Sequence, residues 1–272
     1  MDIILYTIIF LIGIFFGSFY TLAIYRIPKR QDIIKKRSYC PNCNHALGTL
    51  DLIPVFSYLF LGAKCRYCKQ KIKPRYFIIE ILSGFVFVAL AYLMDISVYN
   101  LSIQNVVPYI FFSLYITFIF IMSGIDKENR KIEKSVNMFA IIVSLAYIIY
   151  LWILENANIY RYVIYIVCYI LILLLDTITL RKCAKNKYVN GILIIIIIMA
   201  IFTGEYVTIN TIILTLLAIS IYLLLQKIRM KRNKSKKTDK ILSKDITIGY
   251  YLGISNIIFL LFVLTCSKFL IL

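Results

Sequence analysis

Charged residues are scarce in this chain. They make up only 16% of its 272 residues, whereas apolar residues make up 61%. A chain of this length would ordinarily form one or two soluble domains. Here, however, the apolar residues come in long uninterrupted runs, and a run of about 18 or more is typical of a membrane-spanning helix. The composition therefore excludes an ordinary soluble protein.

Basic residues are absent before the first apolar run. That run, IILYTIIFLIGIFFGSFYTLAIY, is also too long for the apolar part of a typical signal peptide, so we expect a retained helix. The whole sequence predicts eight membrane segments. They lie near residues 3–23, 76–94, 107–123, 136–154, 160–180, 189–203, 207–225 and 246–267. The predicted fold class is all-α, a polytopic membrane protein of about eight transmembrane helices.

Lysine and arginine are nearly missing from every second connection between these segments. Of the 31 basic residues, 29 lie in 26–75, 124–135, 181–188 and 227–244, and the exceptions are Arg161 and Lys268. Basic loops of membrane proteins are cytoplasmic. We therefore expect a protein of the cell membrane with both termini outside. The net charge of +18 then reports cytoplasmic loops, and no nucleic-acid partner is expected.

Cysteine is concentrated in the first cytoplasmic loop. Two C-x-x-C pairs, Cys40/Cys43 and Cys65/Cys68, stand 21 residues apart. The cytosol disfavours disulfides, and four thiolates satisfy tetrahedral Zn²⁺, so the spacing predicts a structural zinc site. Four reduced, unligated cysteines are the alternative. The single histidine, His45, could replace one ligand, although a surface histidine fits better beside four cysteines.

Acidic residues number only 13, so a carboxylate in or beside an apolar segment is informative. Asp126 follows the third segment and precedes several basic residues, with which it could simply pair. Asp176 lies about one turn inside the fifth segment. Glu80 opens the second segment. Glu205 is expected to be solvated in an outer turn, and Asp51 to be solvated or to cap a turn between the cysteine pairs.

Several stretches together resemble the type IV prepilin leader peptidases, which are membrane aspartyl proteases and N-methyltransferases. FGSFYTLAIYRIPK, SYCPNC, LDLIPVFSYL, KCRYC and PRYFIIEILSG follow that family's first helix, zinc-binding domain and second helix in order. ITIGYYLGI, near the C-terminus, resembles a weakened family stretch. The expected domains are a first helix over 1–23, a cytoplasmic four-cysteine zinc-binding domain over 24–75 and a seven-helix peptidase-like domain over 76–272.

The resemblance implies two catalytic aspartates. In IDKENRKIEK, Ile125, Asp126 and Ile132 match the first motif, with Glu133 and Lys134 in place of its later residues. In KYVN, Asn190 stands at the position of the second aspartate, and the two motif glycines are missing. An asparagine side chain cannot exchange a proton near neutral pH. Asp176 is the alternative second carboxylate, although it lies on a different segment.

The resemblance implies cleavage of the basic leader of prepilins or pseudopilins at the cytoplasmic membrane face, and methylation of the new N-terminus with S-adenosylmethionine. An inactive homologue that binds prepilins or pilus and secretion assembly proteins is the alternative, because of Asn190. A zinc-domain scaffold unrelated to pili is a third hypothesis, which the N-terminal resemblance disfavours.

Overall fold

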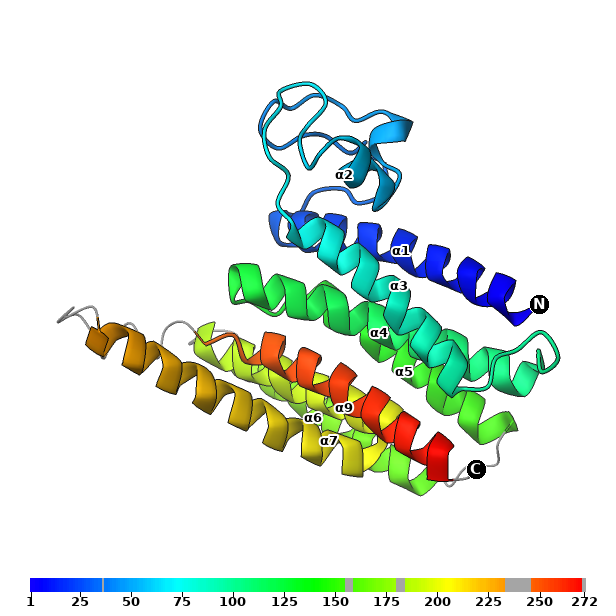
Figure 1. Ribbon diagram of the computed structural model, residues 1–272. Coiled ribbons are helices and arrows are strands. Elements are labelled where there is room, and N and C mark those ends of the chain that lie inside the picture. Colours follow the sequence, from blue (N-terminus) through cyan, green and yellow to red (C-terminus); the bar gives the residue numbers. More distant parts are fainter. Residues whose placement is uncertain (36, 155–158, 180–183, 233–245, 271–272) are drawn as a thin grey trace. The chain divides into compact units, whose positions relative to one another are not determined.

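The regular structure of the chain is helical. The computed structural model describes residues 1–35, 37–154, 159–179, 184–232 and 246–270. Within these ranges, β-type pairing is confined to two isolated bridges in the loop after the first long helix. The long helices are α1 (Asp2–Arg26), α3 (Arg75–Leu93), α4 (Ile103–Asn129), α5 (Lys134–Leu154), α6 (Ile159–Thr179), α7 (Ala184–Arg232) and α9 (Ile248–Leu270) (Figure 1). The predicted all-α class is confirmed.

Most of the long helices are suited to a membrane. Six stretches of the described residues are long and apolar enough to cross one: Asp2–Lys29, Arg75–Leu93, Ile103–Asn129, Lys134–Leu154, Lys187–Ile228 and Ile248–Phe269. In α6 the apolar stretch is shorter, Tyr160–Leu174. Each of the eight predicted segments falls on one of the long helices. The sixth and seventh lie on α7, and the fifth lies on α6, which has 21 residues.

Helix α7 consists of two arms. At 49 residues it would extend about 70 Å if it were straight, more than twice the hydrocarbon thickness of a bilayer. Its backbone leaves the helical conformation at Gly204, where φ is 79° and ψ is 166°. Figure 1 shows the chain changing direction sharply between the two arms. A positive φ is accessible to glycine without a steric penalty, so Gly204 separates the predicted segments 189–203 and 207–225 at the connection expected between them.

The chain divides into two compact units, Met1–Ser113 and Leu114–Leu272. In the first unit, α1 and α3 pack against each other and are joined by the cysteine-containing loop, which includes the short helix α2 (Phe56–Phe60) (Figure 1). The end of α1 is tied into this loop by Arg26, which is 2% exposed and donates to the carbonyl oxygens of Asp32 and Arg37.

Small residues bring α1 and α3 into close contact. A Cβ atom added to Gly13 would lie 2.7 Å from the Gly84 Cα, and one added to Gly17 would lie 2.6 Å from the Glu80 Cα. Ser83, which is fully buried, donates a 2.7 Å hydrogen bond to the Gly13 carbonyl. Close backbone approach through small residues is a common way for helices to pack in a membrane, where the hydrophobic effect does not hold them together.

The second unit is held together by buried polar and aromatic contacts among its helices. The Tyr115 hydroxyl donates to Asn256 Oδ1 at 2.6 Å, and Asn256 Nδ2 donates to Thr211 Oγ1 at 3.3 Å, which links α4, α9 and α7. The Phe202 ring of α7 stacks on Tyr115 and Tyr147, with centroid distances of 4.6 and 4.8 Å. These contacts hold α4, α5, α7 and α9 together in the part of the unit around Tyr115.

Candidate functional site

The four paired cysteines come together in the first unit. Their Sγ atoms all lie within 4.8 Å of one another, and Cys40 Sγ is 3.9 Å from Cys68 Sγ. Four sulfurs arranged tetrahedrally around Zn²⁺ at about 2.3 Å would be roughly 3.8 Å apart. Cys40 and Cys65 are 8% and 6% exposed, so one thiol of each pair is removed from solvent. The donor set and its spacing fit a zinc ion.

Each cysteine pair sits on the same small backbone motif. The amide of Cys40 donates to the His45 carbonyl at 3.0 Å, and the amide of Cys65 donates to the Gln70 carbonyl at 2.8 Å. The residue after each second cysteine has a positive φ, 55° at Asn44 and 58° at Lys69. The two isolated bridges, Tyr39 with Ala46 and Lys64 with Lys71, flank the pairs in the same way. All these positions are related by a shift of 25 residues, so the domain is a repeated knuckle whose two halves present two thiolates each.

Asp51 connects the two knuckles. Its side chain is only 4% exposed and accepts hydrogen bonds from Arg66 Nε at 2.7 Å, the Tyr67 hydroxyl at 3.1 Å and the Gly48 amide at 3.2 Å. Burial by itself would raise the pKa of this carboxyl group, but the hydrogen bonds from Arg66, Gly48 and Tyr67 outweigh it and hold the pKa below its usual range. The expected solvated aspartate is therefore a buried tie within the domain, although its bond to the Gly48 amide does cap a turn.

The His45 side chain makes its contacts with residues other than the four cysteines. Its ring stacks on Tyr67 with a centroid distance of 3.6 Å, and its Nδ1 lies 2.7 Å from the Ala46 carbonyl oxygen. The residue is exposed, as a surface histidine would be. The thiolate cluster forms without it.

Asp126 lies inside α4, one turn before its end. The helix continues to Asn129, beyond the predicted end of the third segment, and stops where Arg130 takes a positive φ of 51°. The Asp126 side chain is fully buried. The expected surface pairing with the neighbouring bases is not its main interaction, because its hydrogen-bond partners come from α7 and α9.

One carboxylate oxygen of Asp126 is hydrogen-bonded, and the other is buried without a partner among the described residues. Oδ2 accepts the Tyr188 hydroxyl at 3.1 Å and the Tyr250 backbone amide at 3.0 Å. The Tyr188 oxygen in turn accepts the Ile248 amide at 3.0 Å. Oδ1 is buried and has no hydrogen-bond partner in the described part of the chain. An unpaired buried carboxylate oxygen is costly, which makes this position a candidate for contact with water or a substrate.

The glycines of ITIGYYLGI explain why α9 can approach Asp126 so closely. A Cβ atom on Gly249 would lie 3.0 Å from Asp126 Oδ2, and one on Gly253 would lie 1.9 Å from Ser123 Oγ. The two glycines are four residues apart, so they lie on one face of α9. This spacing lets the Tyr250 amide reach the carboxylate.

Asn190 is half-buried near the start of α7, two residues after Tyr188. Residues two apart on a helix point to different sides, so Tyr188 rather than Asn190 provides the side-chain contact with Asp126. The adjacent Gly191 packs against Ile132, where an added Cβ would be 2.8 Å from Ile132 Cγ2. The side chain of Asp176, the alternative second carboxylate, lies outside the described residues.

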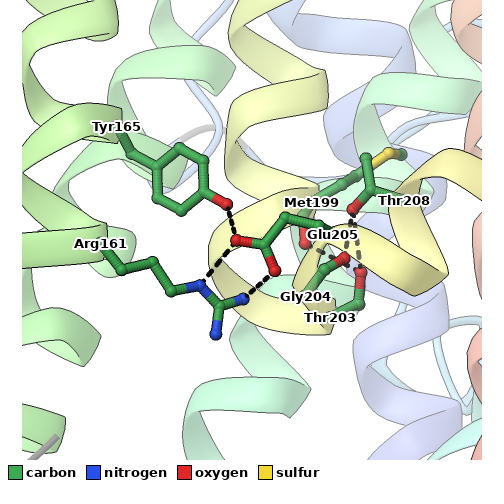
Figure 2. Close-up of polar contacts among 7 residues, drawn as sticks. All are labelled: Arg161, Tyr165, Met199, Thr203, Gly204, Glu205 and Thr208. Atoms are coloured by element: carbon green, nitrogen blue, oxygen red, sulfur yellow. Dashed lines mark hydrogen bonds and ion pairs between the residues drawn. The ribbon is translucent and has the colours of Figure 1, made fainter. Parts of the chain in front are cut away.

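The expectation that Glu205 is simply solvated is wrong. Its carboxylate accepts hydrogen bonds from Arg161 Nε at 2.7 Å and Nη2 at 2.5 Å, and another from the Tyr165 hydroxyl. Figure 2 shows these α6 side chains converging on Glu205 beside the break at Gly204. The pair is partly exposed, with 44% of the Arg161 side chain and 53% of the Glu205 side chain accessible. This cluster joins α6 to the turn of α7, so its role is structural.

Sequence reasoning missed Tyr188 and Tyr250 as partners of Asp126. Tyr188 lies in KYVN, between the positions of the two missing glycines. Tyr250 contributes its backbone amide, which no side-chain pattern reports. The Tyr250 ring lies beside Lys127, whose Nζ is 4.1 Å from the ring centroid and donates a 2.7 Å hydrogen bond to the hydroxyl oxygen. The signal available in the sequence was the Gly-x-x-x-Gly spacing of residues 249 and 253.

The similarity of this chain to a known protein family lies in the first unit. Residues 11–94 match the family model described as "Bacterial Peptidase A24 N-terminal domain". These residues include the four clustered cysteines and exclude both Asp126 and Asn190. The predicted resemblance to the prepilin leader peptidase family is therefore confirmed by a match to the first third of the chain.

Several curated proteins named "Prepilin leader peptidase/N-methyltransferase" are similar to this chain. The one from Myxococcus xanthus is 42% identical over 81 residues, which are 30% of this chain and 24% of the relative. The one from Vibrio cholerae is 35% identical over 119 residues, 40% of this chain and 44% of the relative. The one from Bacillus subtilis is 40% identical over 83 residues, 30% of this chain and 34% of the relative. The chain thus spans less than half the length of each of these relatives.

No solved structure matches the chain. The six apolar helices of membrane length and the family resemblance together indicate an inner-membrane protein.

Proposed function

We propose that this protein is a prepilin leader peptidase that cleaves slowly, with Asp126 as its one catalytic carboxylate. The observation that carries the proposal is the state of Asp126, a fully buried carboxylate whose Oδ2 is fixed by Tyr188 and the Tyr250 amide while Oδ1 has no partner among the described residues. The similarity to proteins named prepilin leader peptidase/N-methyltransferase supplies the substrate class, the basic leader of a prepilin or pseudopilin.

The proposed slowness follows from the partners of Asp126. Aspartyl proteolysis uses two carboxylates that share a proton, one taking a proton from water and the other giving one to the leaving group. The described partners of Asp126 are a phenol and a backbone amide, and neither is a carboxylate. Asn190, at the family's second aspartate position, can hydrogen-bond water but cannot shuttle its proton. Loss of one such group costs several decades in rate.

The orientation of the protein is part of this proposal. The 29 basic residues in alternate connections favour a cytoplasmic loop domain and two termini outside the cell. The end of α4 that carries Asp126 and the basic residues after it would then face the cytoplasm, where a prepilin leader is located before export.

Zinc has a structural role in the proposed protein. Cys40, Cys43, Cys65 and Cys68 would hold it, and four thiolates leave no coordination position open for water or substrate. The ion would fix the two knuckles relative to each other. S-adenosylmethionine would be the methyl donor if the N-methyltransferase activity in the relatives' names is retained, and we assign no residue to it.

A second candidate function is a homologue that binds prepilins or assembly proteins without cutting them. The observation that favours it is again the Tyr188 hydroxyl in contact with Asp126, since this hydrogen bond occupies the carboxylate with a group that has little acid–base reactivity near neutral pH. Such a protein would bind the leader without cleaving it.

Co-expression with a prepilin distinguishes the two candidates. Leader removal is read as a size shift and confirmed by the mass of the new N-terminus, with the natural protein compared with Asp126→Ala and Asp126→Asn. Slow cleavage that both substitutions abolish supports the peptidase. Co-purification of intact prepilin with no cleaved product over long incubation supports the binding protein. Cleavage that survives Asp126→Ala excludes the aspartyl mechanism.

A further inference from the structure

Helix α2 and the residues just before it carry an apolar surface on the loop domain. We define this α2 face by five exposed side chains: Leu50, Ile53, Phe56, Leu59 and Phe60. Phe60 is 87% exposed and Leu59 is 58% exposed. Four of the five, Leu59 excepted, line a cavity of about 260 Å³. Contiguous apolar surface on a small domain marks a site where something else covers it.

The α2 face lies beside the end of a membrane span. The Tyr58 ring stacks on Phe77 of α3 with a centroid distance of 5.0 Å, and the Val55 amide donates to Glu80 Oε2 at 2.7 Å. Both α3 residues belong to the first two turns of the span Arg75–Leu93. Glu80 is five residues into that helix, about 7.5 Å along its axis. Helix α2 therefore lies alongside the end of α3, at the depth of its first turns.

The joint between α2 and α3 is held in a fixed geometry. Val55 has φ 64° and ψ −55°, a conformation that a β-branched residue adopts only under constraint. Its amide is bonded to Glu80, which is 8% exposed although it is an ionisable residue in an apolar span. A buried carboxylate that satisfies a strained backbone amide fixes where α2 begins. The exposed Phe56, Leu59 and Phe60 are thereby held at the level of the span's end.

The loop domain that carries the α2 face is strongly basic, as suits a lipid surface, and Arg66 lines the cavity of the face itself. The segment from Arg26 to Arg75 carries 12 Lys and Arg but only two acidic residues, Asp32 and Asp51. Exposed lysines of this segment include Lys64, Lys69, Lys71 and Lys73. Apolar side chains flanked by basic ones are the usual composition of a peptide surface that inserts into the interface of an anionic bilayer.

We propose that the α2 face is embedded in the headgroup and acyl boundary of an anionic bilayer, so that the zinc-binding domain is anchored on the membrane surface beside α3. Phe60 and Leu59 enter the acyl region, and Arg66, which lines the same cavity, meets the lipid phosphates. An apolar segment of a bound polypeptide is the competing occupant. The proposal requires only that α3 spans a bilayer, so it stands or falls separately from the peptidase activity.

Depth-dependent fluorescence quenching tests the proposal. The chain has one tryptophan, Trp152, and a Trp152→Phe background allows a single reporter to be placed at Phe60→Trp or Phe56→Trp. A matched control is Gln70→Trp, at an exposed position in the second knuckle of the same domain. Each protein is reconstituted into phosphatidylcholine and phosphatidylglycerol vesicles, with or without phospholipid brominated on its acyl chains, and its zinc content verifies the fold.

We expect brominated lipid to quench Phe60→Trp by about twofold or more and Phe56→Trp measurably, because interfacial side chains reach the bromine depth. Gln70→Trp should be quenched little. Quenching of Phe60→Trp and Phe56→Trp that is no greater than that of Gln70→Trp overturns the proposal. If brominated lipid leaves the tryptophan emission unchanged, but a synthetic prepilin segment shifts it, then a polypeptide occupies the α2 face. That result also overturns the proposal.

Discussion

The cysteine domain and the surroundings of Asp126 differ in how far apart in the chain their partners lie. In the first, each pair is only three residues apart, each knuckle is closed by hydrogen bonds over four or five residues, and the two knuckles are 25 residues apart. In the second, Asp126 meets Tyr188 and Tyr250, which are 62 and 124 residues away. A local pattern determines the first site, whereas helix packing determines the second.

The largest expected effect concerns the cysteine domain. Cys40→Ser should lower bound zinc from about one per chain to well below that, because a structural zinc site contributes directly to folding. Protein accumulation should fall with it. Metal analysis of purified protein measures the first effect and immunoblotting the second.

Cys168→Ser is the matched control, since Cys168 lies singly in α6 and outside the thiolate cluster. Equal zinc in the two variants would contradict the site.

The surroundings of Asp126 should respond to changes in combination. Asn190→Asp alone should restore little cleavage, because Tyr188 holds the Asp126 oxygen and Asn190 points to another side of α7. The triple change Lys187→Gly, Val189→Gly and Asn190→Asp should raise leader cleavage further, since glycines allow the backbone to rearrange. A size-shift assay with co-expressed prepilin measures both.

Tyr188→Phe in the same triple background sharpens this test. Removal of the hydroxyl frees Asp126 Oδ2 from one of the two groups that donate to it, so we expect more cleavage than in the triple variant alone. Brisk cleavage by Asn190→Asp alone would show that the backbone around residue 190 is already suitable.

Helix packing can be compared in the two units with single methyl groups. Gly17→Ala should destabilise the first unit by about 1–3 kcal/mol, because its Cβ would lie 2.6 Å from backbone of α3. Gly253→Ala should cost less, because the closest atom is the Ser123 hydroxyl, which can rotate away. Thermal unfolding in detergent measures both.

Gly48→Ala is the control for these two variants, because an added Cβ there has no neighbour closer than 3.6 Å. A larger loss from Gly253→Ala than from Gly17→Ala would mean that Ser123 cannot move.

The smallest expected effect is at the tie between α6 and α7. Glu205→Gln and Arg161→Gln should each cost less than about 1 kcal/mol, since the pair is partly exposed and screened by salt. A double-mutant cycle at low and high ionic strength isolates the coupling. Coupling that is large and independent of salt would show that this cluster is shielded from solvent.

The sequence alone predicted the all-α class, the long apolar segments and the thiolate cluster. Each of these depends on residues close together in the chain, namely the length of an apolar run and the spacing of a C-x-x-C pair. The same local logic placed a connection at residues 204–206 between the sixth and seventh segments, and the backbone of α7 leaves the helical conformation at Gly204.

Tertiary structure alone decided which groups surround Asp126, what Asp51 and Glu205 do, and where α2 lies. Asp51 and Glu205 resembled ordinary loop carboxylates, and each gained its partners only when Arg66 and Arg161 were brought to it by packing. The position of α2 beside α3 depends on a backbone amide and a strained φ angle at Val55, neither of which leaves a side-chain pattern. Such contacts depend on how closely helices approach. Small residues such as Gly17 and Gly249 permit a close approach, but their presence in the sequence does not predict which helix will pack there.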